Sequence, residues 1–191
     1  LCYFPQIWAS DNTDAVSRAY IQEGLSYGYP MSTVSAHVSV CPNHQTLRVT
    51  PLSTRFNVAA FGICGYECNL VDMSRAERSE IKTQIDIYKK WRHAMQFGSF
   101  YRQRTGNIHQ WTVVDEEAGR AVGLIMQELV RANTQNEEYY AAGLDPEAVY
   151  SFYNRPLKHN VKEFGDLINT VAPIHIRQGS LLHGMVAKFV T

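Results

Sequence analysis

The sequence lacks an excess of charge of either sign. It has 18 Lys and Arg residues against 18 Asp and Glu residues, which leaves no basic surface large enough to favour a nucleic acid partner. Long hydrophobic runs are also missing. No apolar stretch approaches the ~20 residues that a transmembrane helix needs, so we expect no contact with a membrane. These absences are typical of a soluble folded protein.

Cysteine is scarce, and its spacing excludes a disulfide framework. The four cysteines Cys2, Cys41, Cys64 and Cys68 do not have the regular spacing of small secreted domains, so we expect reduced thiols. Cys64 and Cys68 have no matching second pair, so the sequence predicts no structural zinc site.

What is present is typical of a folded protein. The chain has 191 residues, of which 45% are hydrophobic and 12% aromatic, enough for one domain or two small ones. Most aromatic side chains of any protein fill its core, although tyrosine and tryptophan also line sugar-binding sites. Residues 1–8 are already apolar and aromatic, without a cap or a signal-peptide pattern, so we interpret the chain as a piece of a longer protein.

The first half of the chain repeats a strand–loop–helix unit. The apolar patterns predict strands over 3–9, 34–40 and 66–71, with helices over 15–25 and 53–61. The clearest helix begins at a capping box formed by Ser74 and Glu77 and ends at Gly98. Successive units of this kind indicate a parallel sheet with helical crossovers, and hence an α/β fold.

The second half of the chain has a different rhythm. Short strands are predicted over 108–114, 121–130, 148–153 and 185–190, separated by Gly, Asn, Asp and Pro residues. We therefore expect two domains with a boundary near Arg102: an α/β region over 1–102 and an antiparallel β region over 103–191.

The candidate catalytic residues follow the first two strands, because reactive groups of parallel α/β folds lie at the carboxyl ends of strands. Asp11 lies on the loop after Trp8 and is the better candidate for proton transfer, with an ordinary N-cap aspartate as the alternative. Asp14 lies at the helix start, four residues before Arg18, and is expected to form an ion pair with it.

The second strand and the loop after it also carry polar side chains, at His37, Asn43, His44 and Gln45. A second carboxylate or histidine at metal-ligand spacing is missing there, so we expect these residues to shape the loop rather than to catalyse a reaction. The spacing of residues alone predicts a parallel α/β protein with polar loops at the carboxyl ends of its strands, and no specific activity.

Residues 10–18 (Ser-Asp-Asn-Thr-Asp-Ala-Val-Ser-Arg) contain the pattern Ser-Asp-x-x-Asp-x-x-x-Arg, which resembles the acid/base signature of microbial α-galactosidases of glycoside hydrolase family 36. Further segments look like the same family in the same order: 5–8, 36–39, 42–45, 55–59, 65–67, 143–146 and 164–169. The resemblance spans nearly the whole chain.

The resemblance implies the end of a (β/α)8 TIM barrel followed by most of an antiparallel, β-sandwich-like C-terminal domain. It implies an enzyme that hydrolyses terminal α-galactosides such as melibiose, raffinose and stachyose with retention of configuration, without a metal or cofactor. Asp11 would be the general acid/base, Asp14 and Arg18 a supporting pair, and Trp8 part of the galactose pocket, with a place in the core as the alternative for Trp8.

One departure from the family pattern matters. The nucleophile of these enzymes lies in an upstream Lys-Trp-Asp motif, and this tripeptide does not occur here. We therefore expect the fragment to be inactive alone and poorly soluble, because an incomplete barrel leaves a sheet edge and an apolar face uncovered. The resemblance further suggests a homo-oligomeric parent, for instance a tetramer, in the cytoplasm.

Three alternatives remain open. A raffinose-synthase type of galactosyl transferase shares the superfamily. A non-catalytic carbohydrate-binding or scaffolding module would use the tyrosines of the second half, Tyr139, Tyr140, Tyr150 and Tyr153. An unrelated α/β enzyme that only imitates the motif would not depend on Asp11.

Overall fold

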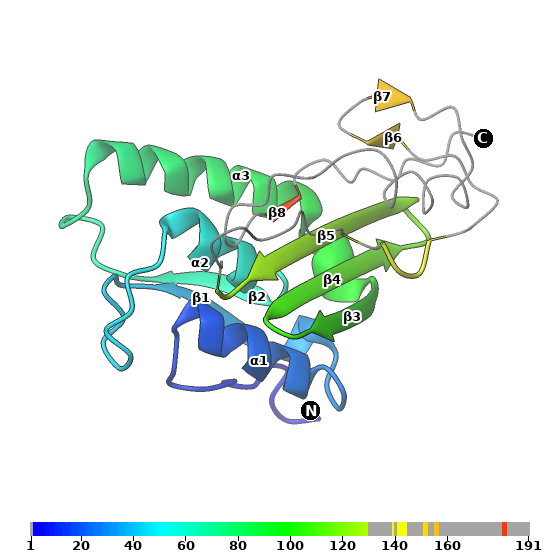
Figure 1. Ribbon diagram of the computed structural model, residues 1–191, viewed down its shortest axis with the longest axis horizontal. Coiled ribbons are helices and arrows are strands. Elements are labelled where there is room, and N and C mark those ends of the chain that lie inside the picture. The colour runs from blue at the N-terminus through cyan, green and yellow to red at the C-terminus, as the bar shows by residue number, and fades with distance from the viewer. Residues whose placement is uncertain are drawn as a thin grey trace. The chain divides into compact units, whose positions relative to one another are not determined.

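The computed structural model describes residues 2–129, 139, 141–144, 151–152, 155–156 and 181–182 (Figure 1). The chain divides into two compact units, residues 1–97 and 98–191. The strand–helix order predicted for the first half and the antiparallel order predicted for the second half are both present. In the described part of the chain, no helix has both the length and the apolar character needed to cross a bilayer.

The first unit contains a small parallel sheet. Strands β1 (Ser35–Ser39) and β2 (Ile63–Glu67) pair in parallel, with Ser35 opposite Ile63 and Ser39 opposite Glu67. The strand predicted over 3–9 is reduced to one parallel bridge between Ile7 and Val34. Parallel pairing places the carboxyl ends of these segments at the same edge of the sheet. The loops that carry the candidate catalytic residues begin at this edge.

Each extended segment of this unit leads into a helix: α1 (Ala15–Leu25), α2 (Leu52–Ala59) and α3 (Arg75–Phe97), with a 3-10 turn η1 (Met31–Thr33) before β1. Ala36 and Val38 alternate along β1 and are fully buried, consistent with the packing of α2 against this strand. The predicted capping box starts α3: the Glu77 amide donates to Ser74 Oγ (3.2 Å) and the Ser74 amide donates to Glu77 Oε2 (2.8 Å).

Strand β2 begins three residues earlier than the sequence predicts. Gly62 and Gly65 are typical of turns, but here Gly62 allows a close approach of two backbones. A Cβ at this position would lie 2.7 Å from the carbonyl oxygen of Val34, so only glycine lets the chain enter the sheet there. Helix α3 is tied to this strand, because the Tyr88 hydroxyl accepts from the Cys64 amide and donates to the Gly62 carbonyl, both at 3.1 Å.

The second unit is built on an antiparallel sheet. Its strand order is β3 (Ser99–Thr105), β4 (Ile108–Asp115), β5 (Arg120–Gln127) and β8 (Leu181–Leu182), and a separate pair joins β6 (Ser151–Phe152) to β7 (Arg155–Pro156). The sequence missed β3, whose alternate residues are polar and exposed, and β8. The strand predicted over 185–190 lies outside the described residues.

The core of this sheet lies along β4 and β5, where nearly every side chain is buried. Trp111 is fully buried, and Tyr139 packs beside it with its hydroxyl donating to the Trp111 carbonyl (2.9 Å) and bonded to Thr112 Oγ1 (2.6 Å). Tyr139 is therefore a core residue and not the exposed sugar platform that the binding-module alternative requires. The other three tyrosines of that alternative lie outside the described residues.

Candidate functional site

The candidate site begins with the loop between Ile7 and α1. The bridge at Ile7 anchors this loop, since the Ile7 amide donates to the Thr33 carbonyl (2.7 Å) and its carbonyl accepts from the Ser35 amide (3.0 Å). Two side chains then stiffen the turn: Ser10 Oγ accepts from the Asn12 amide and Asn12 Oδ1 accepts from the Asp14 amide, both at 3.1 Å. The backbone that carries the candidate carboxylates is therefore held at both ends.

Asp11 is exposed at the outer end of this loop, and its carboxylate is oriented by Trp8. The indole Nε1–H of Trp8 donates to Asp11 Oδ1 at 2.8 Å. Trp8 is 54% exposed, so it does not lie in the core that the described residues form. The two residues that were predicted to act together in substrate binding and proton transfer therefore contact each other directly.

The indole of Trp8 lies against the imidazole of His37, which extends from the middle of β1. The ring centroids are 4.4 Å apart and the planes meet at 40°. Burial lowers the pKa of His37, and the positive charge of Arg18 lowers it further, while Glu67 acts in the opposite direction. The contact with Trp8 is therefore made by a neutral imidazole at neutral pH.

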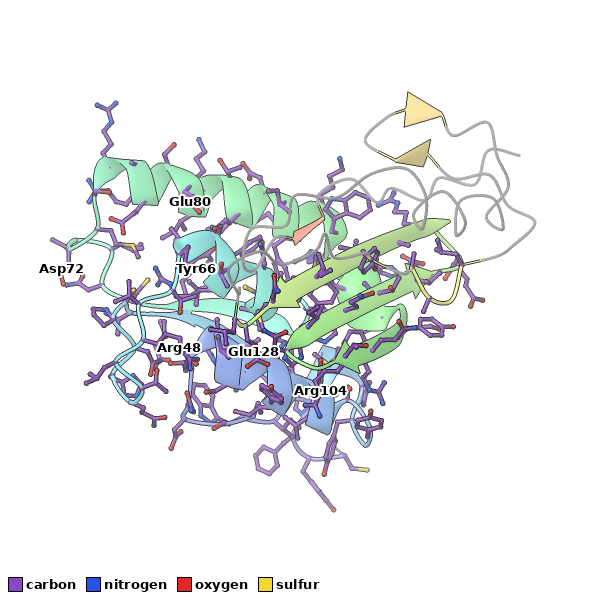
Figure 2. The ribbon with its side chains drawn as sticks, viewed as in Figure 1. Arg48, Tyr66, Asp72, Glu80, Arg104 and Glu128 are labelled. Carbon is purple, nitrogen blue, oxygen red and sulfur yellow. The ribbon has the colours of Figure 1, made fainter. Side chains whose placement is uncertain are left out.

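The predicted ion pair between Asp14 and Arg18 is wrong. Asp14 is the N-cap of α1, and its Oδ2 accepts from the amide and the hydroxyl of Ser17, both at 3.1 Å. The same oxygen pairs with Arg48, which is labelled on the loop after β1 in Figure 2. An N-cap side chain folds back over the first helical turn and does not run along the helix, so Asp14 does not meet the residue four positions later.

Arg18 instead binds main-chain carbonyls. Its Nη1 donates to the Ser10 carbonyl at 3.3 Å, and its Nη2 donates to the Ser35 carbonyl. Burial of the guanidinium lowers the pKa of Arg18 to about 10, so the group stays charged at neutral pH. Arg18 thus joins the loop before Asp11 to β1, which is a supporting role reached by a different contact from the one predicted.

The loop after β1 has the shaping role that the sequence predicts. Asn43 is buried, and its Oδ1 accepts from the amides of Gln45 and Thr46, both at 3.0 Å. Its Nδ2 donates to Thr13 Oγ1 at 3.3 Å, which links this loop to the one that carries Asp11. His44 is exposed on the same loop. The two loops therefore support each other.

The cysteines are unpaired thiols in the structure. Burial raises the pKa of Cys64 to about 12, and burial also raises that of Cys68. Among the described residues, no three His, Cys, Asp or Glu side chains lie close enough to share a metal ion.

Sequence reasoning missed two contributors to this site. Arg48 lies 34 residues after Asp14, and no local pattern connects them. His37 was assigned to loop shaping, whereas it packs against Trp8; its period-2 position on β1, facing away from the buried Ala36 and Val38, is the signal that would have indicated this.

Comparison with known proteins assigns both halves of the chain. Residues 1–98 match the Melibiase family, and residues 108–183 match the glycosyl hydrolase family 36 C-terminal domain. Alpha-galactosidase Mel36A of Lactobacillus acidophilus is 43% identical over 150 residues, which are 78% of this chain and 20% of the relative. Alpha-galactosidase AgaA of Geobacillus stearothermophilus is 42% identical over 153 residues, 78% of this chain and 21% of the relative.

Solved structures of α-galactosidases are also similar to the structure of this chain. A crystal structure of the family 36 α-galactosidase AgaB from Geobacillus stearothermophilus covers 94% of this chain with a TM-score of 0.82 and 38% identity. A variant of AgaA in complex with raffinose covers 94% with a TM-score of 0.83 and 36% identity. This chain spans about a quarter of either structure and about a fifth of the curated relatives. The chain therefore belongs to the Melibiase family of glycoside hydrolases, continuing into the C-terminal domain of family 36.

Proposed function

We propose that this chain is the acid/base part of a retaining α-galactosidase that releases terminal α-galactose from oligosaccharides such as melibiose, raffinose and stachyose. The observation that carries the proposal is the Asp11 carboxylate, exposed on a stiffened loop at the carboxyl end of a parallel strand segment. Its place within the residues that match the Melibiase family supports the same role.

In this mechanism Asp11 acts twice. As an acid it gives its proton to the glycosidic oxygen while the C–O bond breaks and a nucleophilic carboxylate attacks the anomeric carbon. As a base it then takes a proton from the water that hydrolyses the covalent intermediate. The nucleophile would come from a part of the enzyme outside this sequence, because the Lys-Trp-Asp tripeptide is absent here. We therefore propose that the fragment alone is inactive.

The fold proposal follows the same line. The unit over residues 1–97 would supply the last strand–helix units of a (β/α)8 barrel, with the Ile7 bridge, β1 and β2 as its parallel strands. The antiparallel sheet would be part of a β-sandwich-like C-terminal domain. Since β3 already belongs to this sheet, the domain would begin at Gly98, earlier than the boundary near Arg102 that the sequence predicts. We further propose α-galactoside oligosaccharides as ligands, a homo-oligomeric enzyme and residence in the cytoplasm.

The test is Asp11→Asn in the complete α-galactosidase that contains this chain. General acid–base groups contribute typically about 10²–10⁴-fold, so turnover of raffinose should fall by about that factor. The loss should be smaller for 4-nitrophenyl α-galactoside, whose leaving group needs little protonation. Asp72→Asn is the matched control, because Asp72 is an exposed loop carboxylate before α3 (Figure 2) and should leave turnover unchanged. Unchanged turnover in Asp11→Asn would refute the proposal and leave a motif without catalytic meaning.

A further inference from the structure

We propose that Trp8 is a positioning residue for the acid/base step, and that its indole N–H selects Oδ2 of Asp11 as the oxygen that carries the catalytic proton. The inference rests on the proposed function, since it assigns a role to Trp8 within the same site. It differs from the galactose-wall role expected from the sequence, because the indole acts here on the carboxylate and not on the sugar.

The chemistry of the donor decides which carboxyl oxygen is protonated. The Trp8 Nε1–H lies 2.8 Å from Asp11 Oδ1. An indole nitrogen can only donate, so Oδ1 must accept and cannot hold a proton directed at the indole. A neutral Asp11 therefore carries its proton on Oδ2, which leaves Oδ1 as the fixed point about which the carboxyl group is oriented.

The Trp8 ring is itself held in place. The residue before it makes the Ile7 bridge to β1, which restrains the backbone at the start of the loop. One face of the indole packs on His37 at a centroid distance of 4.4 Å, and His37 is half-buried on β1. A group positioned by a strand and a ring contact supports the carboxylate better than a loop side chain alone.

The step balances with the nucleophilic carboxylate that the proposed function requires from the rest of the enzyme. In the first half-reaction the Oδ2–H bond of Asp11 breaks and the proton goes to the glycosidic oxygen, which keeps the electron pair of the broken C–O bond while the nucleophilic carboxylate bonds to the anomeric carbon. In the second half-reaction Oδ2 takes a proton from water while the water oxygen bonds to the anomeric carbon and the bond to the nucleophilic carboxylate breaks. Trp8 donates its hydrogen bond to Oδ1 throughout and exchanges no proton.

The decisive variant is Trp8→Phe in the complete enzyme, because phenylalanine keeps a ring against His37 and loses the N–H. A hydrogen bond to a charged group of this kind is worth roughly a factor of ten to a hundred. We expect kcat/KM to fall by about that factor for methyl α-galactoside, a poor leaving group, and by much less for 4-nitrophenyl α-galactoside, with KM nearly unchanged. Trp91→Phe removes an indole N–H on α3, away from this site, and should leave kcat/KM unchanged for both substrates.

A second replacement separates the N–H from the shape of the ring. Incorporation of benzothienylalanine at position 8 keeps the bicyclic ring and substitutes sulfur for N–H. It should therefore reproduce the loss of activity expected for Trp8→Phe. The same replacement tests the role of the N–H if Trp8→Phe fails to fold. Wild-type activity with this analogue, or an equal loss on both substrates through KM, would overturn the positioning role in favour of a sugar wall.

The two proposals fail differently. If Asp11→Asn is impaired and Trp8→Phe is not, only the positioning role is wrong. If Asp11→Asn retains full turnover, the proposed function is wrong and the positioning role is overturned with it. In the Asp11→Asn background Trp8→Phe should cost little more, because it acts through the carboxylate.

Discussion

Gly123→Ala is the substitution in this chain whose effect the structure defines most sharply. Gly123 lies on β5 beneath Tyr139, and a Cβ added there would lie 2.2 Å from the Tyr139 hydroxyl oxygen and 2.6 Å from its Cζ. Both distances are shorter than any van der Waals contact. Tyr139 is fully buried, so its ring cannot move into solvent without leaving the core.

The cost can be worked out from these contacts. Displacing Tyr139 stretches or breaks two hydrogen bonds of its hydroxyl, to the Trp111 carbonyl and to Thr112, each worth about 0.5–1.5 kcal/mol net. Overpacking a buried site adds about 1–3 kcal/mol. The free energy of unfolding should therefore fall by about 2–6 kcal/mol.

Thermal unfolding of the complete enzyme, followed by circular dichroism, measures this loss as a lower Tm, with Gly24→Ala as the matched control. Gly24 lies in α1 with no heavy atom within 4 Å of an added Cβ, and alanine is better than glycine in a helix by about 0.5–1 kcal/mol. The same substitution should therefore stabilise one site and strongly destabilise the other. A Tm for Gly123→Ala equal to or above that of the wild type would refute the placement of Tyr139 over Gly123.

A double-mutant cycle tests the contact itself. Tyr139→Phe removes the oxygen that lies closest to the added methyl group, so Gly123→Ala should cost less in that background than in the wild type. Additive effects would show that the Tyr139 hydroxyl does not contact the added methyl group, whatever the size of the single losses.

Two further predictions follow from buried polar groups. Arg18→Met should lower the free energy of unfolding by about 1–3 kcal/mol net. The carbonyls of Ser10 and Ser35 lose a charged donor, and this loss outweighs the relief of the desolvation that lowers the pKa of Arg18. An increase in the denaturant midpoint would contradict this prediction. Alkylation with iodoacetamide at pH 8 should modify the exposed Cys2 and spare Cys64, because the pKa of Cys64 is raised to about 12 and its thiolate is correspondingly rare. Rapid alkylation of Cys64, detected by mass spectrometry, would contradict the raised pKa.

Local signals predicted the helices of the first unit well. The Ser74 and Glu77 capping box fixes the start of α3 through two reciprocal hydrogen bonds within four residues. Asp14 starts α1 in the same local way, by accepting from the first helical turn. Such signals are readable in a sequence because both partners lie within one turn of the chain.

Local signals failed where two distant segments meet. Gly62 lies between the predicted helix over 53–61 and the predicted strand over 66–71, and its close approach to the Val34 carbonyl, 28 positions earlier, allows β2 to begin at Ile63. Asp14 was paired with the nearest arginine, whereas Arg48 arrives from another loop. In each case the sequence contains both partners, but it does not show how close they lie in the folded chain.

For the candidate site, the sequence alone determined the residue types and their order: a tryptophan at a strand end, two carboxylates in a short loop and an arginine in the following helix. The tertiary structure decided which of them meet. Trp8 lies against His37 because the parallel bridge between Ile7 and Val34 brings residues 29 positions apart side by side, and from there the indole N–H of Trp8 reaches Asp11. Hydrogen bonds and ring contacts depend on separations of a few ångströms, and only the folded path of the chain sets those separations.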